Sequence, residues 1–133
     1  MQHESAPDIW FAPKLYLRDV AAGILFYQQA FNAVELRRWS NDDGTVHVAE
    51  LQIGNALFHL HEETLRIREL SPQTLNGTPV VIGLFVPDPH EVQKRAVVAG
   101  ASELQPVIDY EYGYQQGSFA DPFGHHWTVQ KRI

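Results

Sequence analysis

Apolar and polar residues alternate along several short segments of this chain, and two other segments follow the spacing of a helix. The alternation is clearest near the C-terminus, where Trp127 and Val129 are separated by polar residues. This period of two is typical of a strand with one buried face. Apolar residues at helical spacing begin at Val20, directly after Asp19, a residue that favours helix starts. The pattern predicts a helix that ends near Asn32 in a left-handed conformation.

The rest of the chain continues this succession of short strands and helices. A second helix is expected between Asp88 and Gly100, because aspartate followed by proline is favourable at a helix start and glycine commonly ends a helix. Residues 1–8 are expected to be a tail and residues 63–78 a linker. The expected strands are residues 9–17, 33–40, 45–53, 56–61, 79–86, 102–110, 118–120 and 126–130.

The order of one strand, one helix and three strands occurs twice. The two copies superpose at an offset of 69 residues, the separation between the helix-capping residues Asp19 and Asp88. The same offset places Phe58 on Trp127, both on the apolar face of a final strand. An internal repeat of this kind indicates two similar modules. We expect an α+β fold in a single domain, residues 1–133, with module one at about 9–62, a linker at 63–78 and module two at about 79–131.

Four sequence motifs, in this order and spacing, resemble a known superfamily. They lie at residues 15–19, 26–33 and 48–54, and in the segment Asp-Pro-Phe-Gly-His-His-Trp at 121–127. Together they resemble the glyoxalase, bleomycin-resistance and extradiol-dioxygenase superfamily, the vicinal oxygen chelate fold, and most closely its PhnB-like branch. The resemblance implies two βαβββ modules that form an open barrel around a central cavity. It also implies a homodimer.

The same resemblance implies four positions for metal ligands in the cavity. They fall on Ala12, His59, Val81 and Thr128, and of these only His59 has the side chain of a good ligand. One imidazole does not hold a divalent ion specifically, so we expect no cofactor. The alternative is a divalent metal at an atypical site that combines His59 and His61 with His126 or His47.

Composition narrows the classes of partner. The formal net charge is −6 with no basic stripe, which argues against nucleic acid. No apolar run approaches the roughly 20 residues of a membrane span. The chain has no cysteine, so disulfides and thiolate chemistry are excluded. We expect a cytoplasmic protein whose partners are a small organic molecule and a second copy of itself.

Strand alternation, combined with the barrel that the resemblance implies, predicts which side chains line the cavity. Several of them are aromatic, and three tyrosines fall within five residues, at 110–114. Aromatic walls with a few polar groups suit a flat ligand bound by stacking or by cation–π contact. The expected cavity residues are Tyr16, Trp39, His59, His61, Phe85, Tyr112, Tyr114, His126 and Thr128.

Three functions fit these residues. The preferred interpretation is a binding protein that holds an aromatic or cationic organic ligand without a metal. The second is a glyoxalase-like lyase or isomerase, or a dioxygenase, with a metal at the atypical histidine site. The third is a metal-free enzyme that uses His59 or Glu50 as a general base. Whether the protein catalyses a reaction is left open by the sequence.

Overall fold

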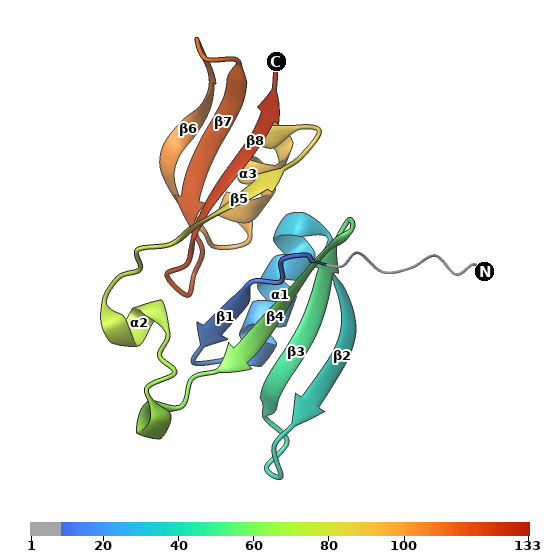
Figure 1. Ribbon diagram of the computed structural model, residues 1–133, viewed down its shortest axis with the longest axis vertical. Coiled ribbons are helices and arrows are strands. Elements are labelled where there is room, and N and C mark those ends of the chain that lie inside the picture. The colour runs from blue at the N-terminus through green and yellow to red at the C-terminus, as the bar shows by residue number, and fades with distance from the viewer. Residues whose placement is uncertain (1–8) are drawn as a thin grey trace, which may run out of the picture.

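Two modules of the same topology make up the molecule (Figure 1). The computed structural model describes residues 9–133, so the tail expected at residues 1–8 lies outside the described residues. Module one contains β1 (Lys14–Leu17), α1 (Val20–Phe31), β2 (Val34–Ser40), β3 (Val46–Ile53) and β4 (Ala56–Glu62). Module two contains β5 (Val81–Phe85), α3 (Pro89–Val98), β6 (Ser102–Tyr110), β7 (Tyr114–Ala120) and β8 (His126–Arg132).

Each module forms a four-stranded sheet with the same strand order. The orders are β1-β4-β3-β2 and β5-β8-β7-β6, and the first strand pairs in parallel with the last. In Figure 1 both sheets lie in front, and α1 and α3 lie behind them. Each sheet therefore has one face covered by a helix and one open face. This α+β arrangement of two βαβββ modules confirms the expected fold.

The predicted helix ends are present in the structure. The Asp19 side chain accepts a hydrogen bond from the backbone N–H of Ala22 at 3.1 Å, and Asp88 accepts one from the N–H of Glu91 at 3.2 Å. Both bonds satisfy backbone donors that the first turn of a helix leaves unpaired. Asn32 ends α1 with a φ of 57°, in the left-handed region.

The hydrophobic core is continuous across the two modules. Phe58 and Trp127, the matching residues of β4 and β8, are 3 % and 2 % exposed, as their alternation predicted. The Trp127 ring centroid lies 4.8 Å from that of Phe31 and 5.6 Å from that of Tyr27, both in α1 of module one. Burying rings at these separations stabilises the packing of module two on module one.

Two strands begin four or more residues away from the predicted position. β1 begins at Lys14 rather than at Ile9, because Pro13 has no N–H for a strand ladder. Ile9 and Phe11, which were expected to be in the strand, are 88 % and 92 % exposed. β7 begins at Tyr114, four residues earlier than expected, so the tyrosine-rich segment lies partly in the strand.

The linker is more ordered than its composition suggests. It contains a 3-10 turn (η1, Leu65–Ile67) and one turn of helix (α2, Pro72–Leu75). Ser71 caps α2 by accepting a hydrogen bond from the N–H of Thr74 at 3.3 Å, and Pro72 takes the first helical position. The serine–proline pair therefore begins a short helix within the expected linker.

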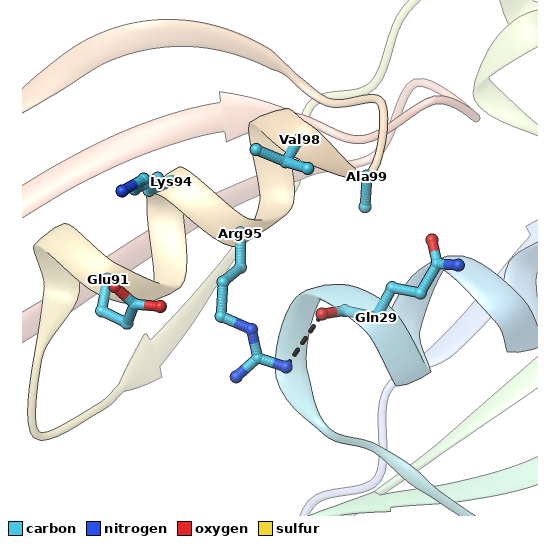
Figure 2. A pocket seen from close by; sticks show the side chains of 6 residues that line it. All are labelled: Gln29, Glu91, Lys94, Arg95, Val98 and Ala99. Carbon is cyan, nitrogen blue, oxygen red and sulfur yellow. Dashed lines mark hydrogen bonds between the residues drawn. The ribbon is translucent and has the colours of Figure 1, made fainter.

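Arg95 joins the two helices behind the sheets. Its guanidinium donates a hydrogen bond from Nη2 to the backbone carbonyl of Gln29 at 2.9 Å (Figure 2). It donates another to the side-chain oxygen of Asn32. A cation at this position satisfies carbonyls that the C-terminus of α1 leaves unpaired. Module two thus caps the helix of module one.

Candidate functional site

The open face of module one carries its polar side chains on β1 and β4. The two strands are in register, with Lys14 opposite His59 and Tyr16 opposite His61. Leu15, between them on β1, is 4 % exposed and points into the core. Strict alternation along both strands therefore gathers two histidines, a lysine and a tyrosine on one surface.

A shallow hollow of about 430 Å³ lies on this face. Each of the four strands of the module-one sheet contributes at least one side chain to its lining. We call it the module-one hollow. It is lined by Lys14, Trp39, His47, Val48, His59 and His61.

The histidines of the hollow interact with each other and with two carboxylates. The rings of His59 and His61 are nearly parallel, with centroids 6.1 Å apart. An oxygen of Glu50 lies 3.8 Å from Nε2 of His59, and an oxygen of Glu62 lies 3.2 Å from Nδ1 of His47. Two of the three imidazoles are thus each next to an acidic side chain.

His61 is held in its neutral form. Burial lowers the pKa of His61 below its usual value, and the positive charge of Lys14 and the neighbouring His59 lower it further. The Nε2 atom is buried and has no hydrogen-bond partner within the described residues. A buried, unpaired N–H is costly, so the uncharged ring is the favoured state.

Tyr16 lies beside the hollow rather than in its lining. Its ring packs edge-on against His61, with centroids 5.8 Å apart. Burial raises the pKa of the Tyr16 hydroxyl, and the nearby Glu69 raises it further. Sequence reasoning did not anticipate Glu69, because it comes from the linker. A short antiparallel bridge between Thr64 and Glu69 folds the linker back to this position.

The other expected aromatic residues gather on module two. The rings of Tyr110 and Tyr112 are stacked 5.1 Å apart, Tyr112 and Tyr114 lie 5.9 Å apart, and Phe85 lies 6.0 Å from Tyr114. The Arg132 guanidinium lies 5.4 Å from the centroid of the Phe85 ring. These rings form one continuous aromatic strip from β5 to the β6–β7 turn.

The predicted cavity residues therefore fall into two groups within one chain. Trp39, His59 and His61 line the module-one hollow with Tyr16 at its side. Phe85 instead lines a separate hollow near the junction of the modules. The members of the second group are on the module-two sheet: Phe85, Tyr112, Tyr114, His126 and Thr128.

The metal positions implied by the resemblance do not form a ligand set. Val81 and Thr128 lie on β5 and β8 of module two, whereas His59 lies on β4 of module one. Ala12 and Val81 have no donor atom, and a threonine hydroxyl is a poor ligand. Among residues 9–133, no group of three histidine or acidic residues is placed to hold a metal ion. The residues at these positions do not fit the metal, and no chemical step is assigned to one.

The turn at residues 121–125 joins the modules instead of lining the hollow. The buried carboxylate of Asp121 accepts hydrogen bonds from the Tyr27 hydroxyl, from Nε1 of Trp127 at 3.0 Å, and from the N–H groups of Phe123 and His125 at 2.9 and 3.0 Å. The backbone bond of His125 therefore helps to fix the turn.

The imidazole of His125 adds a contact that the sequence did not reveal. Its Nε2 lies 2.9 Å from the backbone carbonyl of Tyr16. A carbonyl only accepts, so Nε2 carries the proton in this bond. The turn of module two is therefore connected directly to the strand that carries Tyr16 beside the hollow.

The junction between α1 and α3 offers a further hollow, of about 470 Å³ (Figure 2). Its main polar group is Arg95, which is engaged with the end of α1. The other lining groups on α3 are the side chains of Glu91, Lys94, Val98 and Ala99. This junction has no exposed aromatic ring, so the module-one hollow is the better candidate for a ligand site.

Comparisons with known proteins place the fold in a family. The profile of the Glyoxalase/Bleomycin resistance protein/Dioxygenase superfamily matches residues 10–129. The chain belongs to this superfamily. Two curated relatives are uncharacterized proteins, Mb0911c of Mycobacterium bovis and Rv0887c of Mycobacterium tuberculosis. Each is 38 % identical over 125 residues, which covers 92 % of this chain and 82 % and 74 % of the relatives.

Several solved structures share this fold. TioX from Micromonospora sp. ML1 superposes with a TM-score of 0.75 at 22 % identity, covering 94 % of this chain and 99 % of that one. A gene product of Arabidopsis thaliana gives 0.74 at 26 % identity, covering 92 % and 98 %. The fosfomycin resistance protein FosX of Listeria monocytogenes gives 0.74 at 14 % identity, covering 96 % of both chains. Within the described residues, no helix is long and apolar enough to cross a membrane.

Proposed function

We propose that the protein is a small-molecule binding protein that holds an aromatic organic ligand in the module-one hollow without a metal ion. The observation that carries this proposal is the combination of an aromatic surface and hydrogen-bonding groups on one open face. Trp39 is 40 % exposed at one end of the hollow, and His59 and His61 lie at the other. A ligand stacked on Trp39 would gain about 0.5–1.5 kcal/mol from the ring contact.

Ligand binding, followed by the fluorescence of the protein's tryptophans, tests the proposal. A set of small aromatic compounds is titrated against the protein while tryptophan fluorescence is recorded. We expect a bound compound to quench Trp39, so Trp39→Phe should remove the quenching. The matched control is Trp10→Phe, because Trp10 is also exposed, at 56 %, but does not line the hollow. Equal loss of quenching in both variants would contradict the proposal.

The alternative is a lyase, isomerase or dioxygenase with a divalent metal at an atypical histidine site. The observation that favours this alternative is the proximity of His59 and His61, since two neighbouring imidazoles could share a metal ion. The test is elemental analysis of the purified and dialysed protein. The proposal predicts no stoichiometric divalent metal. Near-unit zinc, nickel, iron or manganese that is lost in His59→Ala would overturn the proposal in favour of the metalloenzyme.

A homodimer is part of the proposal. The open faces of both sheets lie on the same side of the chain (Figure 1) and expose large apolar groups, including Val81 and Phe85 at 55 % each. A second copy facing them would cover these groups and bring an aromatic strip over each module-one hollow. Sedimentation equilibrium tests the assembly. Phe85→Asp should favour the monomer, because it places a charge in the buried centre of the interface.

Two further assignments in the proposal rest on the sequence. The ordered motifs at residues 15–54 and 121–127 support the PhnB-like branch of the superfamily. The cytoplasm is the proposed location, since the chain has no cysteine and so needs no oxidising compartment for disulfides. Detection of the native protein in a fractionated cell tests the location.

A further inference from the structure

We infer that the ligand of the module-one hollow is a planar organic anion, such as an aromatic carboxylate. The inference rests on the proposed function, which makes this hollow the ligand site, and it adds the sign of the ligand's charge and the group that recognises it. The sequence had left the ligand as aromatic or cationic.

The lining of the hollow contains cationic and donor groups but no carboxylate. It consists of one ammonium group, three imidazoles, one indole and one valine side chain. Lys14 is exposed and takes part in none of the ion pairs found within residues 9–133. Its charge is therefore free for a ligand.

The nearest acidic side chains already have partners. Glu62 lies 3.2 Å from Nδ1 of His47 and accepts a hydrogen bond from Asn41 at 3.0 Å. Glu50 lies 3.8 Å from Nε2 of His59. A third carboxylate, Glu69, lies beside the Tyr16 hydroxyl. Each of these carboxylates has a polar neighbour, whereas Lys14 is in none of the ion pairs found within residues 9–133.

A cationic ligand would meet groups of its own sign where it would need an aromatic face. The guanidinium of Arg37 lies 4.5 Å from the centroid of the Trp39 ring, which is the position that a bound cation would take. On module two, Arg132 occupies the corresponding position over Phe85. Arginines of the protein thus lie over the rings of Trp39 and Phe85, and a ligand cation at either ring would be repelled by them.

The strand order sets the shape of the anion. Lys14 and His59 face each other across β1 and β4, and Trp39 lies on β2, two strands away from β4. At an interstrand spacing of ~4.8 Å, β4 and β2 are roughly 10 Å apart. A carboxylate held at Lys14 then leaves room for a two-ring system over Val48 and against Trp39.

Three probes that share one ring system and differ in charge test the inference. They are 2-naphthoate, neutral 2-naphthamide and 2-naphthylmethylammonium, titrated calorimetrically at low salt and at high salt. An exposed ion pair contributes modestly, so naphthoate should bind about two- to fivefold more tightly than the amide. The ammonium should bind more weakly than the amide. High salt should remove most of the preference for the anion.

Lys14→Met identifies the recognising group, because methionine keeps an apolar stem and removes the charge. In this variant, naphthoate should bind no better than naphthamide. The matched control is Lys94→Met on α3, an exposed lysine that lies outside the hollow and should leave the preference unchanged. Circular dichroism of both variants confirms that they are folded.

The outcomes separate this inference from the proposed function. One outcome is that the ammonium or the amide binds best, with binding that depends on Trp39. In that outcome the hollow is a ligand site, but the inference that its ligand is an anion is wrong. If naphthoate binds best but Lys14→Met does not weaken it, recognition by Lys14 is wrong. If none of the three probes binds even at millimolar concentration, both the inference and the proposed function fail.

Discussion

The hydroxyl of Tyr27, in the helix of module one, donates a hydrogen bond to the buried carboxylate of Asp121, in a turn of module two. These residues are 94 positions apart in the sequence. Burial raises the pKa of Tyr27 well above its usual value, and the charge of Asp121 raises it further, so the hydroxyl stays protonated and able to donate. The pair fixes one module on the other through a single carboxylate.

Replacing Asp121 by asparagine should destabilise the protein strongly. The carboxylate accepts from four donors, whereas an amide has one oxygen and would turn its NH₂ group towards some of them. We expect a loss of about 2–4 kcal/mol in the free energy of unfolding, measured by urea denaturation. Asp42→Asn, in an exposed turn, should change it little. Comparable losses in the two variants would contradict the role of Asp121.

Neighbouring residues of β8 should respond very differently to truncation. Trp127→Ala removes a large ring that is 2 % exposed, and it should cost about 3–5 kcal/mol of stability. Thr128→Ala, one residue further on, faces the open side of the sheet and should cost far less. Denaturant midpoints of both variants check the difference. Similar midpoints would show that the face assignment of β8 is wrong.

His61 should titrate below its ordinary pKa of about 6.5, because burial disfavours its charged form and Lys14 repels it. The unfolded chain then binds this proton at a higher pH than the folded protein. The contribution of His61 to stability is therefore complete above pH ~6.5 and is reduced as the pH falls below that value.

Proton NMR of the histidine rings measures this pKa directly. Lys14→Met should raise the pKa of His61 towards its ordinary value, and Lys94→Met should leave it unchanged. A His61 resonance that titrates at or above pH ~6.5 in the unaltered protein would show that the ring is not held neutral.

Glu63 should contribute to stability at neutral pH and lose that contribution in acid. Burial alone would raise the pKa of Glu63, but hydrogen bonds from the N–H of Ser71 and the hydroxyl of Thr74 outweigh it and lower the pKa below the usual 4.5. The stabilisation is complete above about pH 4.5 and is lost as the pH falls through the lowered value.

Glu63→Gln tests this dependence. The variant should be less stable at pH 7, and its stability should fall less steeply between about pH 5 and pH 3, as followed by thermal unfolding. Glu111→Gln, in an exposed turn, is the control and should keep the steep acid dependence. An unchanged acid profile in Glu63→Gln would exclude Glu63 as a source of it.

The sequence predicted the fold well because the repeat and the local signals agree. Asp19 and Asp88 begin their helices as expected, and Phe58 and Trp127 face the core. These features depend on neighbours in the sequence or on strict alternation, which a single chain displays directly. The length of β1 was misjudged because the effect of Pro13 on pairing outweighed the apolar pattern before it.

The site was predicted less completely, because its geometry depends on contacts between distant segments. Alternation correctly grouped His59 with His61 on the open face of β4. It could not show that Glu69 of the linker returns beside Tyr16. Nor could it show that Phe85 lies on a different sheet surface from His59, since the relative placement of two modules is set by core packing rather than by local periodicity.

The contact between His125 and the Tyr16 carbonyl has a consequence for how this protein can associate. The carbonyls of Pro13 and Leu17 accept hydrogen bonds from the N–H groups of His59 in β4 and Glu63 just after it. Alternation therefore turns the Tyr16 carbonyl towards the outer edge of β1. The imidazole occupies that acceptor. A further strand cannot extend the sheet at this position without displacing it, which protects the edge from aggregation by strand addition.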